Sequence, residues 1–247
     1  MSKFVKFIMW FVIIVLLIMG VIYFSYSQNR GFLKMESASL QTQADELLAD
    51  NQSLLTTPPA QSLEPVKPIS ATDHLWGDIN TPVQLIVYTD FDCPFCAEYH
   101  QTLKKVKETY GDTVVIVLRH YPLASHKNAV PAAVAVECAS DQGKFLDMAE
   151  KLYANQKESK NETVEFIKDG EELGLDKEEF KKCLLEERYK TEIIAGKAEA
   201  ETYGVNGTPT SFLGNKILPG AYQFNDFTDQ TGQQYEGLKT LIDQALQ

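Results

Sequence analysis

The sequence has little positive charge, with 23 Lys and Arg residues against 34 Asp and Glu residues and a formal net charge of -11 at pH 7. Binding to nucleic-acid phosphates needs a basic face, so this balance excludes nucleic-acid partners. The sequence also has only four cysteines and four histidines. A structural zinc site usually takes two Cys-x-x-Cys pairs, or one pair with two spaced histidines, and neither pattern is present. We therefore expect no metal and no other cofactor. A zinc site at the single Cys-x-x-Cys pair stays the alternative.

Charge is absent from residues 7–24, a run of eighteen residues that follows Lys3 and Lys6. As a helix this run would measure roughly 27 Å, close to the bilayer core of about 30 Å. A cleaved signal peptide is the alternative, but its apolar region is shorter and ends in small residues. This run ends in Tyr-Phe-Ser-Tyr at 23–26. We expect residues 1–28 to be an uncleaved single-pass anchor in the cell membrane, with a cytoplasmic N-terminus because the lysines precede it.

Residues 29–72 have only a thin apolar pattern and contain Pro58, Pro59, Pro65 and Pro68. Each proline removes a backbone donor and restricts the residue before it. A linker of this composition acts as a semi-rigid spacer. We interpret the segment as a stalk that holds a globular domain, residues 73–247, away from the membrane.

The globular part begins with a strand, a helix and a second strand. Residues 83–89 (VQLIVYT) are an apolar run rich in β-branched and aromatic residues, which predicts a buried strand. Apolar residues then recur at helical spacing from Cys96 to Tyr110, and residues 114–118 (VVIVL) predict a second buried strand. Short connections through one helix indicate a parallel βαβ unit.

Most of the remaining chain has helical periodicity, with Gly170 and Gly174 as expected helix breakers. Two short strands, 210–213 and 216–218, flank a turn typical of a hairpin, and residues 235–246 predict a last helix. The order predicts an α/β fold with a helical block inserted midway. The other expected helices are 129–139, 144–155, 163–173, 177–185 and 189–202.

The motif that carries chemistry is Cys93-Pro94-Phe95-Cys96, at the start of the first predicted helix. Thiols at positions i and i+3 meet over one helical turn and can close a small disulfide. Free N–H groups and the positive dipole end at a helix N-terminus stabilise a thiolate at the first cysteine. Pro94 fits the first turn, where its missing N–H costs nothing. We predict that Cys93 is the nucleophile in disulfide exchange and that Cys96 resolves the mixed disulfide. A purely structural disulfide is the alternative.

With these residues the sequence resembles the DsbA-like branch of the thioredoxin superfamily, from about residue 73 to the C-terminus. An isolated Cys-x-x-Cys is a weak signal, whereas an ordered set of motifs is a specific one. The motifs are Asp90-Phe91-Asp92-Cys93-Pro94-Phe95-Cys96, Arg119-His120-Tyr121-Pro122-Leu123, Glu137-Cys138-Ala139, Gln142-Gly143-Lys144-Phe145 and Gly204-Val205-Asn206-Gly207-Thr208-Pro209-Thr210.

The resemblance implies a thioredoxin-like fold with a helical subdomain inserted over about residues 123–203. It implies that Pro209 is a cis-proline facing the dithiol and that Thr208 presents backbone groups to a bound substrate chain. An extended peptide would pair there by β-augmentation, which explains a broad choice of substrates.

Two features depart from the family. Many thioredoxin-like proteins carry a buried acid six residues before the first active cysteine, where this chain has Val87, so the group that transfers protons at the dithiol is left unassigned. Asp90 and Asp92 lie close by, but a carboxylate beside a thiol opposes thiolate formation. Pro94 and Phe95 also replace the dipeptide with histidine that the strongest oxidases of the family carry. We therefore expect a less oxidising potential than theirs.

The other two cysteines, Cys138 and Cys183, stand singly in predicted helices. They can be two inert buried thiols, since cysteine packs as a small hydrophobe. An even cysteine count in an exported protein favours a disulfide that staples the helical insert. We predict a structural disulfide between Cys138 and Cys183.

The leading hypothesis is a thiol–disulfide oxidoreductase on the periplasmic side of a bacterial envelope. It would introduce disulfides into exported polypeptides and be recharged by a membrane oxidase of the DsbB or VKOR type. Oxidation is favoured because no dimerisation domain is visible in the sequence and an anchor keeps the enzyme near such a partner. The alternatives are an envelope disulfide reductase or isomerase, and a tethered peptide-binding module without turnover.

Overall fold

The computed structural model of the chain describes residues 16–21, 23–24, 65–156 and 163–247. The chain divides into two units, Met1–Ser62 and Leu63–Gln247. The described residues of the first unit are helical and exposed. Within the described part of the chain, no helix combines the length and the apolar character needed to cross a membrane. Most of the predicted anchor, and the predicted stalk up to residue 64, lie outside the described residues.

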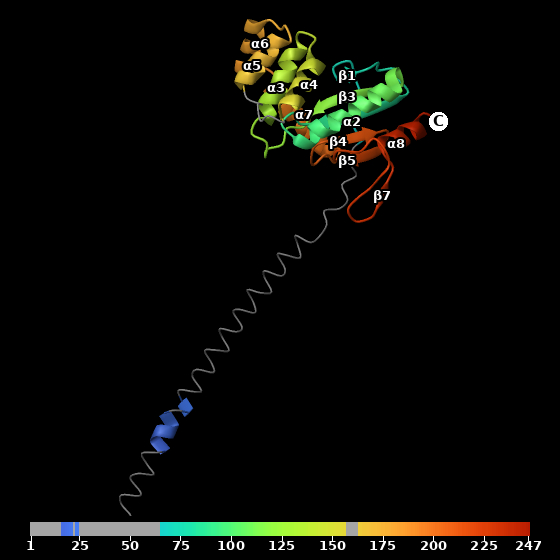
Figure 1. Cartoon of the computed structure of the whole chain (residues 1–247). Coiled ribbons are helices and arrows are strands. Elements are labelled where there is room, and N and C mark those ends of the chain that lie inside the picture. Colours follow the sequence, from blue (N-terminus) through green and yellow to red (C-terminus); the bar gives the residue numbers. More distant parts are fainter. Residues whose placement is uncertain (1–15, 22, 25–64, 157–162) are drawn as a thin grey trace, which may run out of the picture. The chain divides into compact units, whose positions relative to one another are not determined.

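The second unit is built on a five-stranded sheet in the order β1-β3-β2-β4-β5 (Figure 1). β2 and β3 are parallel neighbours in the sheet, and the chain passes from one to the other through α2 (Pro94–Tyr110), which confirms the predicted βαβ unit. The other neighbouring strands pair antiparallel. The predicted hairpin is confirmed too, with Gly214 at its turn in the left-handed region at φ 57°. The strands of this sheet are β1 (His74–Trp76), β2 (Val83–Thr89), β3 (Val114–His120), β4 (Thr210–Leu213) and β5 (Lys216–Pro219), and a separate two-stranded sheet pairs β6 (Phe227–Thr228) with β7 (Gln234–Tyr235).

The predicted helical block lies between β3 and β4, where Figure 1 shows its helices gathered at one end of the sheet. Gly170 lies inside α5, so its expected role as a helix breaker is wrong. A Cβ at this position would come within 2.8 Å of the Phe180 ring, so glycine allows α5 and α6 to approach closely. The helices are α3 (Ala129–Ser140), α4 (Phe145–Asn155), α5 (Thr163–Glu172), α6 (Lys177–Leu185) and α7 (Lys190–Thr202), and α8 (Leu238–Ala245) ends the chain.

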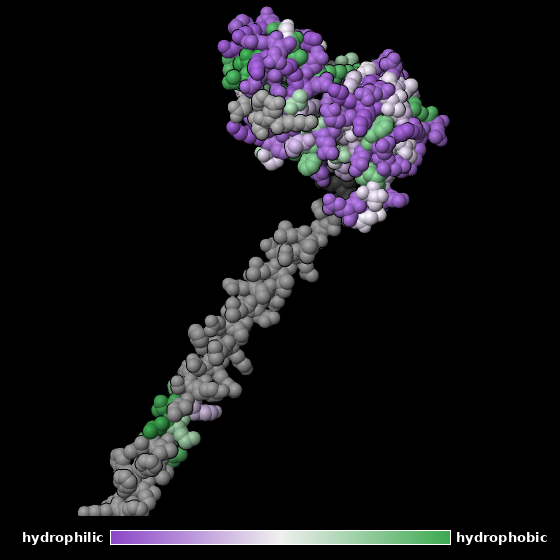
Figure 2. Space-filling view, in the orientation of Figure 1, coloured by the Kyte–Doolittle hydropathy of each residue, from purple (hydrophilic) through white to green (hydrophobic). Residues whose placement is uncertain are grey.

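β2 and β3 are buried on both faces, which explains their continuous apolar runs. Alternate side chains of a strand point to opposite faces of the sheet. Val83, Leu85 and Val87 belong to the larger core with α2, α8 and much of the helical insert. Ile86 and Tyr88 belong to a smaller core, to which α7 contributes. The face of this unit shown in Figure 2 is mainly hydrophilic, as expected when most apolar side chains are buried in the two cores.

Two details differ from the sequence-based expectations. β1 is missing from them because three residues are too short a run to show periodicity, yet it pairs antiparallel with β3 and forms one edge of the sheet. The last helix begins at Leu238 rather than at 235. Gly237 precedes it and approaches the Asn225 backbone so closely that a Cβ would lie 2.2 Å from the Asn225 carbonyl carbon.

Candidate active site at the dithiol

The paired cysteines lie at the junction of β2 and α2. Cys93 is the N-cap of α2, Pro94 begins the helix, and Cys96 lies in its first turn. The Cys93 carbonyl accepts hydrogen bonds from the N–H groups of Cys96 at 3.0 Å and Ala97 at 3.2 Å. Both cysteines are buried free thiols. The first turn carries no acidic residue, so the positive end of the helix is not neutralised beside the Cys93 sulfur.

The electrostatics of the site favour a thiolate at Cys93, whose pKa is lowered to about 6. The hydrogen bond from the Cys96 thiol is the largest cause. The backbone N–H groups of Cys96 and Phe95 and the Thr208 side chain act in the same direction, against the effect of burial. At neutral pH Cys93 is therefore mainly ionised, and the thiolate is the form that reacts in disulfide exchange.

Cys96 has the opposite character. Burial raises the pKa of its thiol well above the usual range, and the neighbouring Cys93 raises it further. The backbone N–H of Asp90 lies 3.5 Å from the Cys96 sulfur. The two thiols of one helical turn therefore differ at neutral pH, because one is ionised and the other keeps its proton.

Two hydroxyl groups lie next to Cys96, on the buried side where many thioredoxin-like proteins carry an acid and this chain has none. Val87 is buried in the larger core and carries no proton to exchange. Thr89 Oγ1 and Tyr153 Oη are 2.6 Å apart, and both residues are buried. The Thr89 hydroxyl interacts with the Cys96 sulfur and lowers its pKa against burial. Sequence reasoning missed this pair because Tyr153 comes from α4, sixty-four residues away from Thr89.

Thr208 and Pro209 lie against the dithiol, and the peptide bond between them is cis. The Cys93 thiol faces the Thr208 carbonyl oxygen at 3.6 Å. The Thr208 hydroxyl is buried and has no other hydrogen-bond partner among the described residues, so it is available to the Cys93 thiolate. Pro209 accepts a hydrogen bond from the Gly220 N–H at 2.8 Å. Phe95, in contrast, is 62% exposed at the mouth of the site.

Asp90 and Asp92 organise the turn before the dithiol. One Asp90 carboxylate oxygen accepts hydrogen bonds from the Leu123 N–H at 2.9 Å and from the His126 ring at 2.8 Å. Asp92 accepts one from the Asn128 N–H at 2.9 Å. The two carboxylates therefore hold the start of the helical insert against the active-site turn, and His126 is engaged there rather than at a thiol.

The remaining cysteines form a disulfide that joins α3 to α6, with the Cα atoms of Cys138 and Cys183 5.8 Å apart. Both residues are buried in the larger core. The disulfide therefore lies within the helical insert, where the sequence analysis expected a staple.

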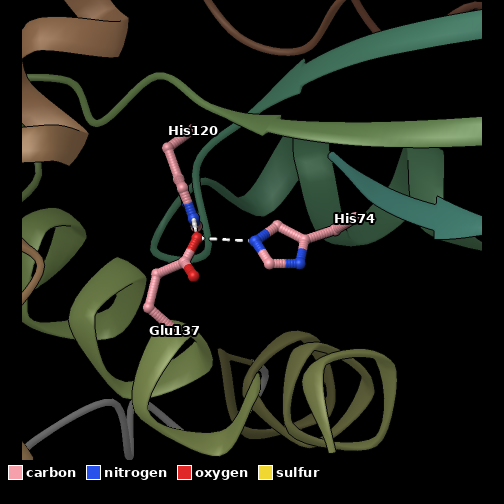
Figure 3. A group of neighbouring side chains, drawn as sticks. All are labelled: His74, His120 and Glu137. Atoms are coloured by element: carbon pink, nitrogen blue, oxygen red, sulfur yellow. Dashed lines mark hydrogen bonds and ion pairs between the residues drawn. The ribbon is translucent and has the colours of Figure 1, made fainter. Parts of the chain in front are cut away.

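A cluster of three side chains that sequence reasoning missed includes Glu137, the residue before Cys138. His74, His120 and Glu137 come from β1, β3 and α3 and point toward one another (Figure 3). Burial opposes ionisation of Glu137, but hydrogen bonds from His120 and His74 lower its pKa to about 2. The histidines are far apart in the sequence, and the short strand β1, which brings His74 beside β3, was not predicted. The cluster could therefore not be predicted either.

Solved structures share this fold at low sequence identity. A thioredoxin-like oxidoreductase from Silicibacter pomeroyi has a TM-score of 0.58 and 24% identity, covering 72% of this chain and 94% of its own. BdbD from Bacillus subtilis, oxidised, has a TM-score of 0.56 and 19% identity, covering 64% and 89%. Alpha-DsbA1 from Wolbachia pipientis has a TM-score of 0.54 and 19% identity, covering 72% and 89%. These similarities support the α/β fold with an inserted helical subdomain.

The chain also matches curated relatives, over only part of the length of each relative. Na(+)/H(+) antiporter NhaA 1 of Mycobacterium sp. (strain KMS) is 32% identical over 172 residues, which is 68% of this chain and 28% of the antiporter. The protein of that name from Mycolicibacterium vanbaalenii is 34% identical over 154 residues, covering 61% and 24%. The chain thus spans about a quarter of these relatives.

The thioredoxin family itself matches residues 70–244, most of the chain and all of the described sheet. That stretch contains the dithiol at a helix N-terminus and the cis-proline facing it. The chain therefore belongs to the thioredoxin family and is a thiol–disulfide oxidoreductase of DsbA-like fold.

Proposed function

We propose that this chain is an oxidase that donates the Cys93–Cys96 disulfide to exported proteins. The observation that carries the proposal is the position of Cys93 at the N-cap of α2, with Cys96 one turn deeper, and it agrees with the lowered pKa of Cys93 beside the raised pKa of Cys96. A thiolate that is stable at neutral pH stabilises the reduced dithiol. Stabilising the reduced form makes the corresponding disulfide a stronger oxidant.

The exchange takes place in two steps. A substrate thiolate attacks the Cys93 sulfur of the disulfide, the Cys93–Cys96 bond breaks, and Cys96 leaves and takes up a proton. A second substrate thiolate then attacks the substrate sulfur of the mixed disulfide and releases Cys93 as a thiolate. The substrate loses two electrons and forms a disulfide, and the enzyme gains them as a dithiol. The low pKa of Cys93 favours the second step, because a more acidic thiol leaves faster.

The neighbouring groups support this chemistry. The exposed Phe95 ring and the Thr208 backbone border the Cys93 sulfur and would contact the substrate chain. An extended peptide pairs with free backbone groups rather than with particular side chains, so its sequence is weakly selected. The Thr89 and Tyr153 hydroxyls would carry the proton that Cys96 needs on leaving.

We place the enzyme outside the cytoplasm, held by the predicted anchor in residues 1–28. A disulfide between Cys138 and Cys183 persists in oxidising compartments, which supports this location. The antiporter relatives share a segment of about the length of the thioredoxin match, so we infer that they carry such a domain on a membrane protein. Their transport activity is not part of the proposal. A membrane oxidase of the DsbB or VKOR type would reoxidise the dithiol.

The test is the reduction potential of the dithiol in the full chain, measured in detergent by titration with glutathione. Cys93→Ser is the control, because it cannot form the disulfide. A potential near or above roughly -180 mV supports an oxidase. A value near roughly -270 mV contradicts it and supports a reductase supplied with electrons across the membrane. Unchanged substrate folding with Cys93→Ser would favour the tethered binding module instead.

A further inference from the structure

Three side chains from three elements converge beside the larger core. The Nε2 atoms of His74 and His120 lie 2.7 Å and 2.5 Å from the same oxygen, Oε1 of Glu137 (Figure 3). The possible ligand atoms of the three residues all lie within 4.8 Å of one another. The cluster joins β1 and β3 of the sheet to α3 of the helical insert.

The donor set is that of a transition metal. Two imidazole nitrogens and one carboxylate are the ligands of many zinc sites that keep a fourth position open, whereas Ca²⁺ and Mg²⁺ prefer oxygen alone. Metal–ligand bonds of about 2.1 Å in a tetrahedral site place ligand atoms about 3.4 Å apart. The observed separations of 2.7 Å and 2.5 Å are shorter by about 1 Å or less. Small movements of the side chains therefore suffice to admit an ion.

The surroundings orient the rings and leave a way in. The His74 ring stacks on Phe145 with ring centroids 3.6 Å apart, and the Phe91 ring packs against His120 at 5.7 Å. The side chains of His74, His120 and Glu137 are 20%, 11% and 15% exposed, so they are shielded without being sealed. All three line a pocket of about 240 Å³, which offers space for the remaining ligand.

We propose that His74, His120 and Glu137 form a binding site for a divalent transition-metal ion, Zn²⁺ by preference, with its fourth position open to this pocket. The ion takes the place of the two Nε2 protons that now point at one carboxylate oxygen, and each imidazole ring then binds through Nε2 as the neutral tautomer with its proton on Nδ1. It would fasten the sheet to the helical insert, whereas the Cys138–Cys183 disulfide joins two helices within the insert. The buried Nδ1 of His120 has no hydrogen-bond partner among the described residues. Since an outer partner of this kind is worth about 10- to 100-fold in affinity, we expect weaker binding than at fully supported zinc sites.

The test removes the Cys93 and Cys96 thiols, because thiolates are zinc ligands and would compete with this site for the ion. The full chain carrying both Cys93→Ser and Cys96→Ser is titrated with Zn²⁺ in detergent by calorimetry, and one equivalent of bound zinc is expected. Glu137→Gln and His74→Gln should each weaken binding at least 10-fold. His126→Asn removes a histidine outside the cluster and should leave zinc binding unchanged. No binding by the double-serine protein, or equal binding after the Glu137 and His74 substitutions, would overturn the proposal.

A second measurement needs no substitution in the cluster, so a variant that fails to fold cannot obscure the answer. The double-serine protein labelled with ¹⁵N-histidine is followed by NMR as Zn²⁺ is added. The ring nitrogens of His74 and His120 should shift together at one equivalent, while those of His100 and His126 stay in place. Co²⁺ should give a tetrahedral absorption spectrum without thiolate charge-transfer bands. Shifts confined to other histidines would contradict the assignment. Either result leaves the oxidase proposal untouched.

Discussion

The chain carries two cysteine pairs that the fold treats in opposite ways. Cys93 and Cys96 are three residues apart, lie at the start of one helix and are free thiols. Cys138 and Cys183 are 45 residues apart, lie within two different helices and are joined by a disulfide. All four are buried, so burial alone does not separate a reactive pair from a structural one.

Position in the helix makes the difference. A cysteine at the N-cap is surrounded by N–H groups with no partner inside the helix, and these stabilise its thiolate. Cys138 and Cys183 lie in the last turns of α3 and α6 and pack in the larger core, and the backbone N–H groups there are already bonded within the helix. The same residue type therefore becomes an exchange group in one place and a fixed cross-link in the other.

Replacing the first cysteine gives the sharpest contrast between the pairs. Cys93→Ser should lower disulfide-exchange activity by several orders of magnitude, because a hydroxyl is not ionised at neutral pH and forms no disulfide. Cys138→Ala with Cys183→Ala should leave the exchange rate within a few-fold of the parent. The measurement is oxidation of a reduced dithiol peptide at 10 °C, where both proteins stay folded. A comparable loss of disulfide-exchange activity in the two variants would contradict the assignment of Cys93–Cys96 as the reactive pair and Cys138–Cys183 as the structural one.

The free energy of unfolding should respond in the opposite way, with the larger loss in the variant that lacks the Cys138–Cys183 bond. Loss of the Cys138–Cys183 bond frees a loop of 45 residues in the unfolded chain, which corresponds to about 4 kcal/mol by the loop-entropy estimate. Denaturant unfolding of the double-alanine variant should show this loss of free energy. Reduced Cys93→Ser should stay close to the reduced parent at pH 5, where the Cys93 thiol is protonated in both the folded and the unfolded chain. If the double-alanine variant unfolds at the parent's midpoint, the disulfide does not restrain the insert.

The reactive cysteine pair can be predicted from the sequence, whereas the residues that pack around it mostly cannot. Cys93, Cys96, the strand before them and the helix after them follow from local patterns, since periodicity and N-cap chemistry act over a few residues. The Thr89–Tyr153 contact and the His74–His120–Glu137 cluster do not follow, because each depends on how the insert packs against the sheet. Gly170 illustrates the same limit. A local rule predicts a break, but the close approach of Phe180 decides its role.

A matched pair of glycine substitutions tests how rigid the cross-linked insert is. Gly170→Ala forces a methyl group against the buried Phe180 ring and should cost about 1–3 kcal/mol of unfolding free energy. Gly196→Ala, in α7 with open space around it, should stabilise by roughly 0.5–1 kcal/mol through helix propensity. Phe180 lies one turn from Cys183, so the cost of Gly170→Ala should shrink in the double-alanine variant, where α6 can move. Equal costs in both backgrounds would mean that the disulfide does not fix α6.

The smallest effect concerns protons at the reactive pair. With a Cys93 pKa of about 6, alkylation of the reduced protein by iodoacetamide should rise about tenfold from pH 5 to pH 7 and then level off. An unperturbed thiol, with a pKa of about 8.5, would keep rising through pH 8. Because the folded pKa lies below the unfolded one, the thiolate stabilises the reduced fold fully above about pH 8.5, and this contribution disappears as the pH falls to about 6. The stability gap between reduced and oxidised protein should narrow over the same range. Since Cys138 and Cys183 do not titrate in either state, a gap that stayed constant with pH would place the low pKa of Cys93 in doubt.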